Sequence, residues 1–290
     1  MTVEEQYSIY KEVVDAYLEN RFPPKDCGWQ TVFKAMNYSL LSPGKRVRPC
    51  LTLAFAELCG GDVMLTLPVA AACEMVHCYS LIHDDLPAMD NDDLRRGKPT
   101  NHKVFGDAMA ILAGDALLTA AFSTALSAPL PPDRLAKAAA LLAAGAGENG
   151  MIAGQVLDIE GEGKKLTVEQ LQQLCLLKTG ALIQTACCLG VAAAGGDETM
   201  MAAARTYGAH LGLAFQIQDD ILDIEGSTAL LGKTVGSDAQ NEKCTFASLL
   251  GVEKCRELVS EHSRLAREAV PMAGGEFLRW FAGKLQSRRK

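Results

Sequence analysis

The chain has 290 residues, of which 49% are hydrophobic and 22% are charged, and it carries a formal net charge of −7. This acidic balance argues against a broad nucleic-acid-binding surface. The first five residues are acidic and show no signal-peptide pattern. Residues 108–128 and 181–195 are the most apolar stretches, but Asp115 interrupts the first and the second is short, so neither is predicted to span a membrane.

The ten cysteines form neither a C-x-x-C pair nor a zinc-like pattern with histidine. Six of them lie in apolar segments, where cysteine acts as a small hydrophobic residue. Free thiols of this kind suit a reducing compartment. The sequence therefore predicts a cytoplasmic protein without disulfides.

Helical periodicity runs through the chain, and no series of strands is apparent. The predicted helices cover residues 4–20, 26–41, 47–58, 66–86, 106–126, 133–142 with the pattern resuming to 159, 167–194 and 198–224, and two or three more follow. Thr167 and Gln170 form a capping-box pattern at one helix start. No linker-like change in composition divides the chain. We expect an all-α fold in which residues 1–290 form a single domain.

Two acidic clusters each emerge from an apolar helical segment. They are Asp84, Asp85 and Asp90 in the first half of the chain, and Asp219, Asp220 and Asp223 in the second. Buried carboxylates are costly unless a cation neutralises them. Asp219 and Asp223 share one helix face, because they are four residues apart. Pro87 should loosen the helix between Asp84 and Asp90, so that both acids turn toward one point.

These clusters predict a magnesium site that holds a diphosphate. Mg²⁺ prefers oxygen ligands and usually takes few carboxylates together with phosphate oxygens. The alternative interpretation of each acidic run is a solvated helix face.

Basic residues near the clusters indicate where anions would bind. The segment Gly44-Lys45-Arg46-Val47-Arg48-Pro49 places cations at a predicted helix start, which is a natural anion site. Arg95 and Arg96 follow the first acidic cluster closely. His77 lies two helical turns before Asp84 and shares its face. An ordinary core histidine is the alternative for His77.

Five motifs together resemble the trans-prenyltransferases, which are the head-to-tail isoprenyl diphosphate synthases, and among them the bacterial farnesyl diphosphate synthase branch. The motifs are the segment 44–49, Asp84-Asp85-x4-Asp90 with Arg95-Arg96-Gly97, Lys178-Thr179-Gly180, Phe215-Gln216-Ile217-Gln218-Asp219-Asp220-Ile221-Leu222-Asp223, and Gly232-Lys233. The resemblance covers about residues 34–250. It implies a large helical bundle around a deep central cavity, usually a homodimer, that uses Mg²⁺ (or Mn²⁺ as a substitute).

The resemblance also implies a role for each matching residue. The metal ligands would be Asp84, Asp90 and Asp219, supported by Asp85, Asp220 and Asp223 through metal-bound waters. The catalytic residues beside the allylic diphosphate would be Lys178, Thr179, Gln216 and Lys233, with Arg95 contacting the same group. The isopentenyl diphosphate site would comprise Gly44, Lys45, Arg48, His77 and Arg96. Gln155 and Asp158 would contact the residues that bind the metal and the diphosphates, without touching the substrates themselves.

Tyr79 bears on the length of the product. It lies five residues before Asp84, where bulk limits chain growth in the resembling family. An aromatic residue there favours farnesyl diphosphate as the product, and geranylgeranyl diphosphate is the alternative product. The alternative interpretation of Tyr79 itself is an ordinary aromatic residue of the core.

Two interpretations from other classes stay open. A terpene cyclase would normally carry a different second metal motif and lack the cations at Lys45 and Arg48. A catalytically silent partner subunit would use the same bundle, but such chains tend to lose acids from one cluster, and both clusters are complete here.

Overall fold

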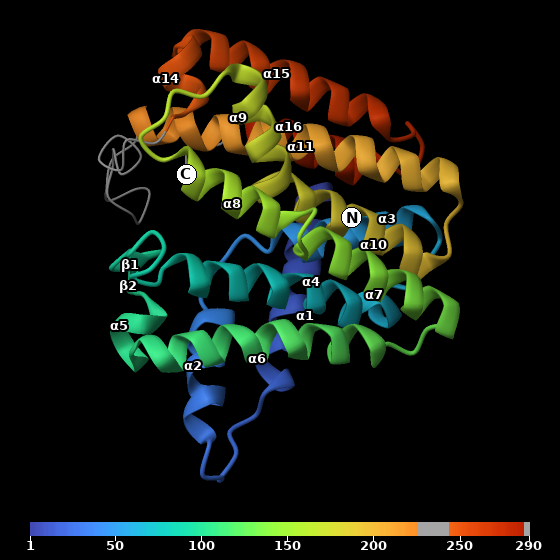
Figure 1. Ribbon diagram of the computed structural model, residues 1–290. Helices are drawn as coiled ribbons and strands as arrows, with labels where there is room; N and C mark the ends of the chain where they lie inside the picture. The colour runs from blue at the N-terminus through green and yellow to red at the C-terminus, as the bar shows by residue number, and fades with distance from the viewer. Residues whose placement is uncertain (226–243, 287–290) are drawn as a thin grey trace.

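The structure is a computed structural model that describes residues 1–225 and 244–286, with side chains through Lys284 (Figure 1). Its helices are α1 (Val3–Arg21), α2 (Gln30–Leu40), α3 (Val47–Leu58), α4 (Val63–Asp84), α5 (Asn101–Phe105), α6 (Asp107–Leu126), α7 (Pro132–Ala146), α8 (Met151–Gly161), α9 (Val168–Cys175), α10 (Ala181–Ala194), α11 (Glu198–Glu225), α14 (Phe246–Leu250), α15 (Val252–Ala269) and α16 (Glu276–Gln286). A π-helical turn, η1 (Leu176–Gly180), joins α9 to α10. The β structure in the described ranges is one antiparallel pair, β1 (Leu94–Arg95) and β2 (Lys98–Pro99). The predicted all-α fold is confirmed.

Most predicted helices agree with the structure to within a few residues, and the differences have local causes. The helix predicted over 66–86 begins at Val63, because the Asp62 side chain accepts hydrogen bonds from the first free N–H groups. It ends at Asp84, before Pro87. The pattern predicted over 133–159 breaks between α7 and α8, where Gly147 and Gly150 form a turn. The capping box of Thr167 and Gln170 is present.

Helices α3, α4 and α10 form the centre of the bundle. They are apolar on nearly all sides, which is the pattern of a helix surrounded by others. The helices α3 and α10 pack closely, because a Cβ at Gly190 would lie only 2.2 Å from the carbonyl oxygen of Thr52. The Thr52 hydroxyl donates to the Ala186 carbonyl at 2.8 Å across this contact.

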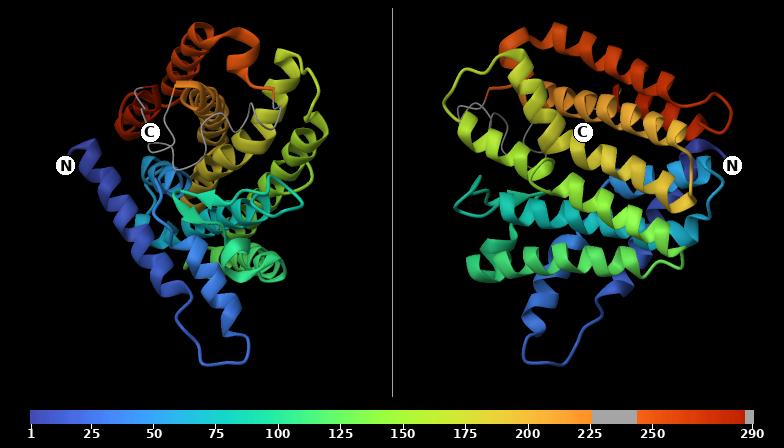
Figure 2. Two further views of the ribbon diagram at one scale, coloured as in Figure 1. Left: turned by 90° about the vertical axis from the view of Figure 1, so that its left-hand side faces the viewer. Right: turned by 45° about the vertical axis from the view of Figure 1, so that its right-hand side comes forward.

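The two acidic clusters meet at one end of the bundle. Figures 1 and 2 show α4 and α11 running toward the same end, where the small β hairpin also lies. Helix α4 ends at Asp84, and α11 carries Asp219, Asp220 and Asp223 in its last turns. Residues 135 positions apart in sequence are therefore brought to one region by the direction of two long helices.

Three helical stretches are long and apolar enough to cross a membrane by length and composition alone. They are Val63–Asp84, Asp107–Leu126 and Val168–Ala194, and 78%, 39% and 67% of their most apolar windows are buried in the fold. The third is longer than the stretch of residues 181–195 considered in the sequence. That none of them crosses a membrane stays a prediction, as does the single domain. The low value for α6 marks an exposed apolar surface.

Candidate active site

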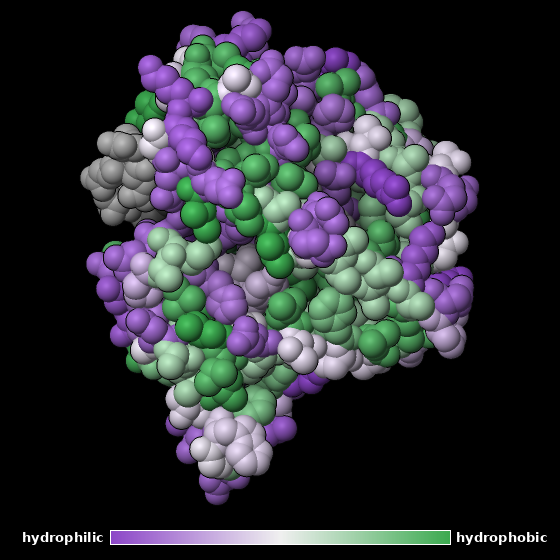
Figure 3. Space-filling view, viewed as in Figure 1, coloured by the Kyte–Doolittle hydropathy of each residue, from purple (hydrophilic) through white to green (hydrophobic). Residues whose placement is uncertain are grey.

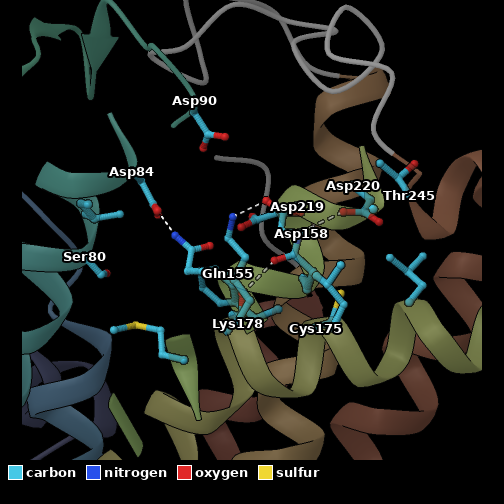
Figure 4. A pocket seen from close by; sticks show the side chains of 18 of the residues that line it. Ser80, Asp84, Asp90, Gln155, Asp158, Cys175, Lys178, Asp219, Asp220 and Thr245 are labelled. Atoms are coloured by element: carbon cyan, nitrogen blue, oxygen red, sulfur yellow. Dashed lines mark hydrogen bonds and ion pairs between the residues drawn. The ribbon is translucent and has the colours of Figure 1, made fainter. Parts of the chain in front are cut away.

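A cavity of about 470 Å³ opens between the acidic ends of α4 and α11. Thirteen of the residues given a role in the sequence analysis line it: Arg48, His77, Asp84, Asp90, Arg95, Arg96, Gln155, Asp158, Lys178, Thr179, Gln216, Asp219 and Asp220. Figure 4 shows Asp84 and Asp90 on one side, and Asp219 and Asp220 on the other. Gly44, Lys45 and Tyr79 are not among the lining residues. Lys233 lies outside the described residues.

The turn after α4 directs two carboxylates into the cavity. The Asp90 N–H donates to the Asp84 carbonyl at 2.9 Å, which closes the turn containing Pro87. The Gln155 side chain of α8 donates to the Asp84 carboxylate. Burial raises the pKa of Asp84 from 3.8 to about 6, although the Lys178 charge opposes the shift. Burial therefore destabilises the ionised form of Asp84, and a cation bound in the cavity would offset this cost.

Asp85 faces Arg95 and is absent from the cavity lining. Its two buried carboxylate oxygens share the single N–H of Arg95 Nε, at 2.7 and 2.9 Å, and Oδ1 lies 2.5 Å from Arg95 Nη2. This geometry ties the β hairpin to the end of α4 and holds Arg95 at the cavity wall. Asp85 thus has a direct structural task that the sequence did not indicate. Its support of a metal through water stays a prediction.

The second acidic cluster divides in a similar way. Asp219 and Asp220 line the cavity, whereas Asp223 is buried on α11 outside the lining. The Asp220 carboxylate accepts hydrogen bonds from the Phe246 N–H at 2.8 Å and from Gln216 Nε2 at 3.1 Å. The bond from Phe246 connects α14 to α11, whereas the bond from Gln216 lies within α11. Asp220 therefore orients Gln216 as well as contributing charge.

Lys178 and Thr179 lie in the π-helical turn η1, which the sequence analysis predicted as ordinary α-helix. Such turns are often found at functional sites. Helix α8 packs closely on this turn, since a Cβ at Gly154 would lie 2.1 Å from the Lys178 backbone nitrogen. Lys178 Nζ pairs with Asp158 at 2.6 Å, and the Thr179 hydroxyl donates to Gln216 Oε1 at 3.1 Å.

A basic wall faces the acidic one. Arg48 Nε is buried and has no hydrogen-bond partner in the described ranges, so this donor can accept an anion as its partner. Arg96 Nη1 donates to the Pro43 carbonyl at 3.1 Å. Gly44 makes room for this contact, because a Cβ there would lie 2.6 Å from Arg96 Nη1. Lys45 is exposed beside them.

His77 lies within this basic wall and is neutral at pH 7. Burial, together with the charges of Arg48 and Arg96, lowers its pKa well below the usual value. A neutral imidazole can donate a hydrogen bond from one ring nitrogen.

Several lining residues were not predicted as part of the site. They are mostly apolar or small and include Ser80, Leu81, Met151, Leu171 and Leu174. Ser80 had a detectable signal, because it lies one helical turn before Asp84. Tyr79 instead packs edge-on against His83, with ring centroids 5.7 Å apart, and the His83 ring contacts the Ile111 carbonyl of α6 at 3.1 Å.

A family model described as polyprenyl synthetase matches residues 30–269. The chain belongs to the polyprenyl synthetase family. It is 47% identical to a farnesyl diphosphate synthase from Geobacillus stearothermophilus over 270 residues, which cover 92% of this chain and 91% of the relative. It is also 47% identical to geranylgeranyl pyrophosphate synthase 3 of Arabidopsis thaliana, over 91% of this chain and 75% of the relative. The predicted family is confirmed.

A solved structure supports the same assignment. The geranyltransferase from Helicobacter pylori, complexed with magnesium and isoprenyl diphosphate, matches with a TM-score of 0.86 and 32% identity, covering 97% of this chain and 96% of that one. The presence of magnesium in this member of the family agrees with the predicted cofactor.

The carboxylates of this chain fit a Mg²⁺ ion that also binds diphosphate and water oxygens. Among residues 1–225 and 244–286, no three His, Cys, Asp or Glu side chains form a group that could hold a metal ion. The carboxylates of Asp84, Asp90 and Asp219 instead line opposite sides of one cavity. An ion would thus take one or two carboxylates and complete its shell with diphosphate and water oxygens, which is usual for Mg²⁺.

We expect Asp84→Asn to stabilise the protein without Mg²⁺ at pH 7.5. The pKa of Asp84 is raised in the fold, so its contribution to stability is present below pH 3.8 and is lost as the pH rises through about 6. The gain should be about 1–2 kcal/mol, because one pKa unit is worth about 1.4 kcal/mol and water in the cavity screens part of it. The difference should shrink toward pH 4. Urea unfolding at several pH values measures it.

Added Mg²⁺ and inorganic diphosphate should stabilise the unsubstituted protein more than Asp84→Asn. An exposed carboxylate on α1 provides the control, since Glu19→Gln should change neither result. Equal stability of Asp84→Asn and the unsubstituted protein at all pH values would contradict the expectation.

Proposed function

We propose that the protein is a Mg²⁺-dependent farnesyl diphosphate synthase. It would join isopentenyl diphosphate first to dimethylallyl diphosphate and then to geranyl diphosphate. The observation that carries this proposal is one cavity with two different anion-binding walls. Carboxylates line one wall, and the other is lined by Arg96, His77 and Arg48, whose Nε has no partner among the described residues. Such a cavity can hold two diphosphates, one bound through metal ions at the carboxylates and the other bound directly by the basic side chains.

The allylic diphosphate would lie at the acidic wall. Mg²⁺ bound there supplies positive charge for the departing diphosphate, and Mn²⁺ is expected to substitute. Arg95 and Lys178 would donate to the same oxygens, and both are already aimed by carboxylates, Asp85 and Asp158. Charges that are positioned before the reaction stabilise the leaving group without reorganisation.

The carbon chemistry would take place beside η1. The allylic C–O bond breaks with its electron pair going to the diphosphate, and a carbocation remains. The isopentenyl double bond attacks this cation, and the released diphosphate accepts the proton that is then lost. Thr179 donates its hydrogen bond to Gln216, so its oxygen lone pairs would face the cation. Apolar lining such as Leu81 and Phe215 excludes water, which would convert the cation to an alcohol.

The isopentenyl diphosphate would be held by the basic wall. Arg48, Arg96 and Lys45 supply charge, and neutral His77 supplies a hydrogen bond. No metal ion is needed there, because guanidinium groups bind phosphate oxygens directly. The site keeps the two diphosphates apart by using metal-bridged contacts for one and side chains for the other.

The test is the product formed from purified protein with isopentenyl and dimethylallyl diphosphates, with and without Mg²⁺. The products are hydrolysed and sized by chromatography. We expect farnesol, and only with Mg²⁺. Geranylgeraniol would support the same condensation reaction but show that the product is geranylgeranyl diphosphate, which is the product named for the similar Arabidopsis synthase. No product longer than five carbons would contradict the synthase assignment and favour a silent partner subunit.

Tyr79→Ala should lengthen the product from fifteen to twenty carbons. Tyr79 is buried one turn and a half below Asp84, and it packs against His83 behind the cavity lining. Removing the ring would open space in which a longer chain grows. The same chromatographic assay measures the change. Tyr38→Phe is the control, since Tyr38 contacts Phe105 and the Pro99 carbonyl instead. An unchanged product would remove Tyr79 from chain-length control.

We further propose a homodimer that forms through α6. Three large apolar side chains of this helix are 44–53% exposed: Ile111, Leu112 and Leu126. Ile152, Val156 and Ile159 of α8 are exposed to a similar degree. Figure 3 shows apolar side chains over both helices on one face of the molecule. A patch of this kind in a soluble protein usually marks an interface.

The ten free cysteines suit a cytoplasmic location.

Leu112→Glu should convert the dimer to a monomer, because a buried unpaired charge at the interface is costly. Size-exclusion chromatography with light scattering measures the mass. Met272→Glu is the matched control, since Met272 is 77% exposed in the loop before α16. A dimer that survives Leu112→Glu would place the interface elsewhere.

A further inference from the structure

Arg46 lies between the two cations predicted to bind isopentenyl diphosphate, yet it turns away from the cavity. It is the residue before α3 and has a left-handed backbone, with φ of 48°. A non-glycine residue adopts this conformation only where its surroundings hold it there. Arg46 is 5% exposed, so its charge is inside the bundle.

Two carboxylates hold Arg46 in this position. Arg46 Nε donates to Asp15 Oδ1 at 2.7 Å, and Nη1 donates to Glu74 Oε1 at 2.9 Å. Nη2 donates to the Leu40 carbonyl at 3.0 Å. The side chains of Arg46 and Glu74 are each 4% exposed. Because a buried charge needs its partner, this pair fixes the position of Arg46.

A third contact holds the residue next to Arg46. The Tyr7 hydroxyl donates to the Lys45 carbonyl at 2.5 Å. The Tyr7 ring packs against Phe277, Trp280 and Phe281 of α16, with centroids 5.7–6.5 Å apart. Tyr7 and Asp15 are eight residues apart on α1 and thus share a face. Helix α1 therefore contacts two successive residues of the segment that leads into α3.

The inward turn of Arg46 decides where its neighbours lie. Lys45 is exposed, and Arg48 lies in the cavity with no partner for its Nε in the part of the chain that the structure describes. Burial lowers the pKa of Arg48 and of Arg96, and the Glu74 charge opposes both shifts. Glu74 thus favours the charged form of these groups while its described hydrogen bond goes to Arg46 alone.

We propose that Tyr7, Asp15 and Glu74 form a brace that positions Lys45 and Arg48 for the isopentenyl diphosphate. These positioning residues act through the Lys45 backbone and through Arg46, and they do not touch the substrate. The proposal rests on the proposed function. The proposal also predicts the direction in which the KM for isopentenyl diphosphate changes when Glu74 is substituted. Removing the negative charge alone would tighten anion binding and lower this KM, whereas loss of positioning would weaken binding and raise it.

The first experiment is Tyr7→Phe, which removes one hydrogen bond and keeps the ring. We expect the KM for isopentenyl diphosphate to rise about five-fold, as the loss of one hydrogen bond gives. The KM for geranyl diphosphate and kcat should stay within about two-fold. Tyr10→Phe is the matched control, because Tyr10 lies on the same helix, packs on Phe277 and bonds to Glu57 instead. It should leave both KM values unchanged.

The second experiment compares Glu74→Gln and Asp15→Asn. Each should raise the KM for isopentenyl diphosphate, by about ten-fold for the fully buried Glu74 and less for Asp15, whose side chain is 37% exposed. Glu19→Gln on α1 serves as the control. If Glu74→Gln does not fold, Tyr7→Phe and Asp15→Asn still decide the matter.

An unchanged or lowered KM for isopentenyl diphosphate in these variants would overturn the brace, as would an equal rise in both KM values. Those outcomes leave the synthase assignment intact, since they are measured as product formation. Absence of product from the unsubstituted protein would instead overturn the proposed function and the brace with it.

Discussion

The structure depends on placing charged groups at one end of an apolar bundle. Buried charges are stable only when they are paired, and here most have an internal partner. Asp85 pairs with Arg95, and Asp158 pairs with Lys178, so that each carboxylate aims a cation at the cavity. Arg48 keeps a buried donor without a described partner. The pairing scheme thus separates groups that organise the site from groups left for a ligand.

Helix ends and one irregular turn deliver these groups. Helix α4 stops before Pro87, and the chain folds back so that Asp90 joins Asp84. The turn η1 changes the pitch between α9 and α10, where Lys178 and Thr179 face the cavity. Because the long helices are rigid and closely packed, small changes at these points set the positions of reactive groups. In the proposed reaction the apolar lining beside them, such as Leu81 and Phe215, would keep water from the reacting carbons.

The acidic and basic walls of the cavity would bind diphosphates that have different fates in the proposed reaction. An allylic diphosphate that must leave needs strong positive charge, which carboxylates can provide only by binding cations. In the proposed reaction the isopentenyl diphosphate stays bound and intact, and the fixed guanidinium groups of Arg48 and Arg96 with a neutral His77 would be sufficient to hold it. The brace behind Arg46 belongs to this second wall, and it ties the wall to both ends of the chain through α1 and α16. On this proposal, binding of the isopentenyl diphosphate and ionisation of the allylic diphosphate would be supported by different parts of the fold.

Most of the helices and both acidic clusters are evident from the order of the amino acids alone. Apolar periodicity, caps and prolines are local signals, so most helix bounds followed from them, and the motif around Asp84 and Asp219 identified the family. Tertiary structure decided which way each charge points. Arg46 turns inward because Glu74, 28 residues later, lies beside it, and Tyr79 packs on His83 toward α6. Spacing along a helix gives the face of a side chain, but its partner on another helix depends on packing that no local pattern contains.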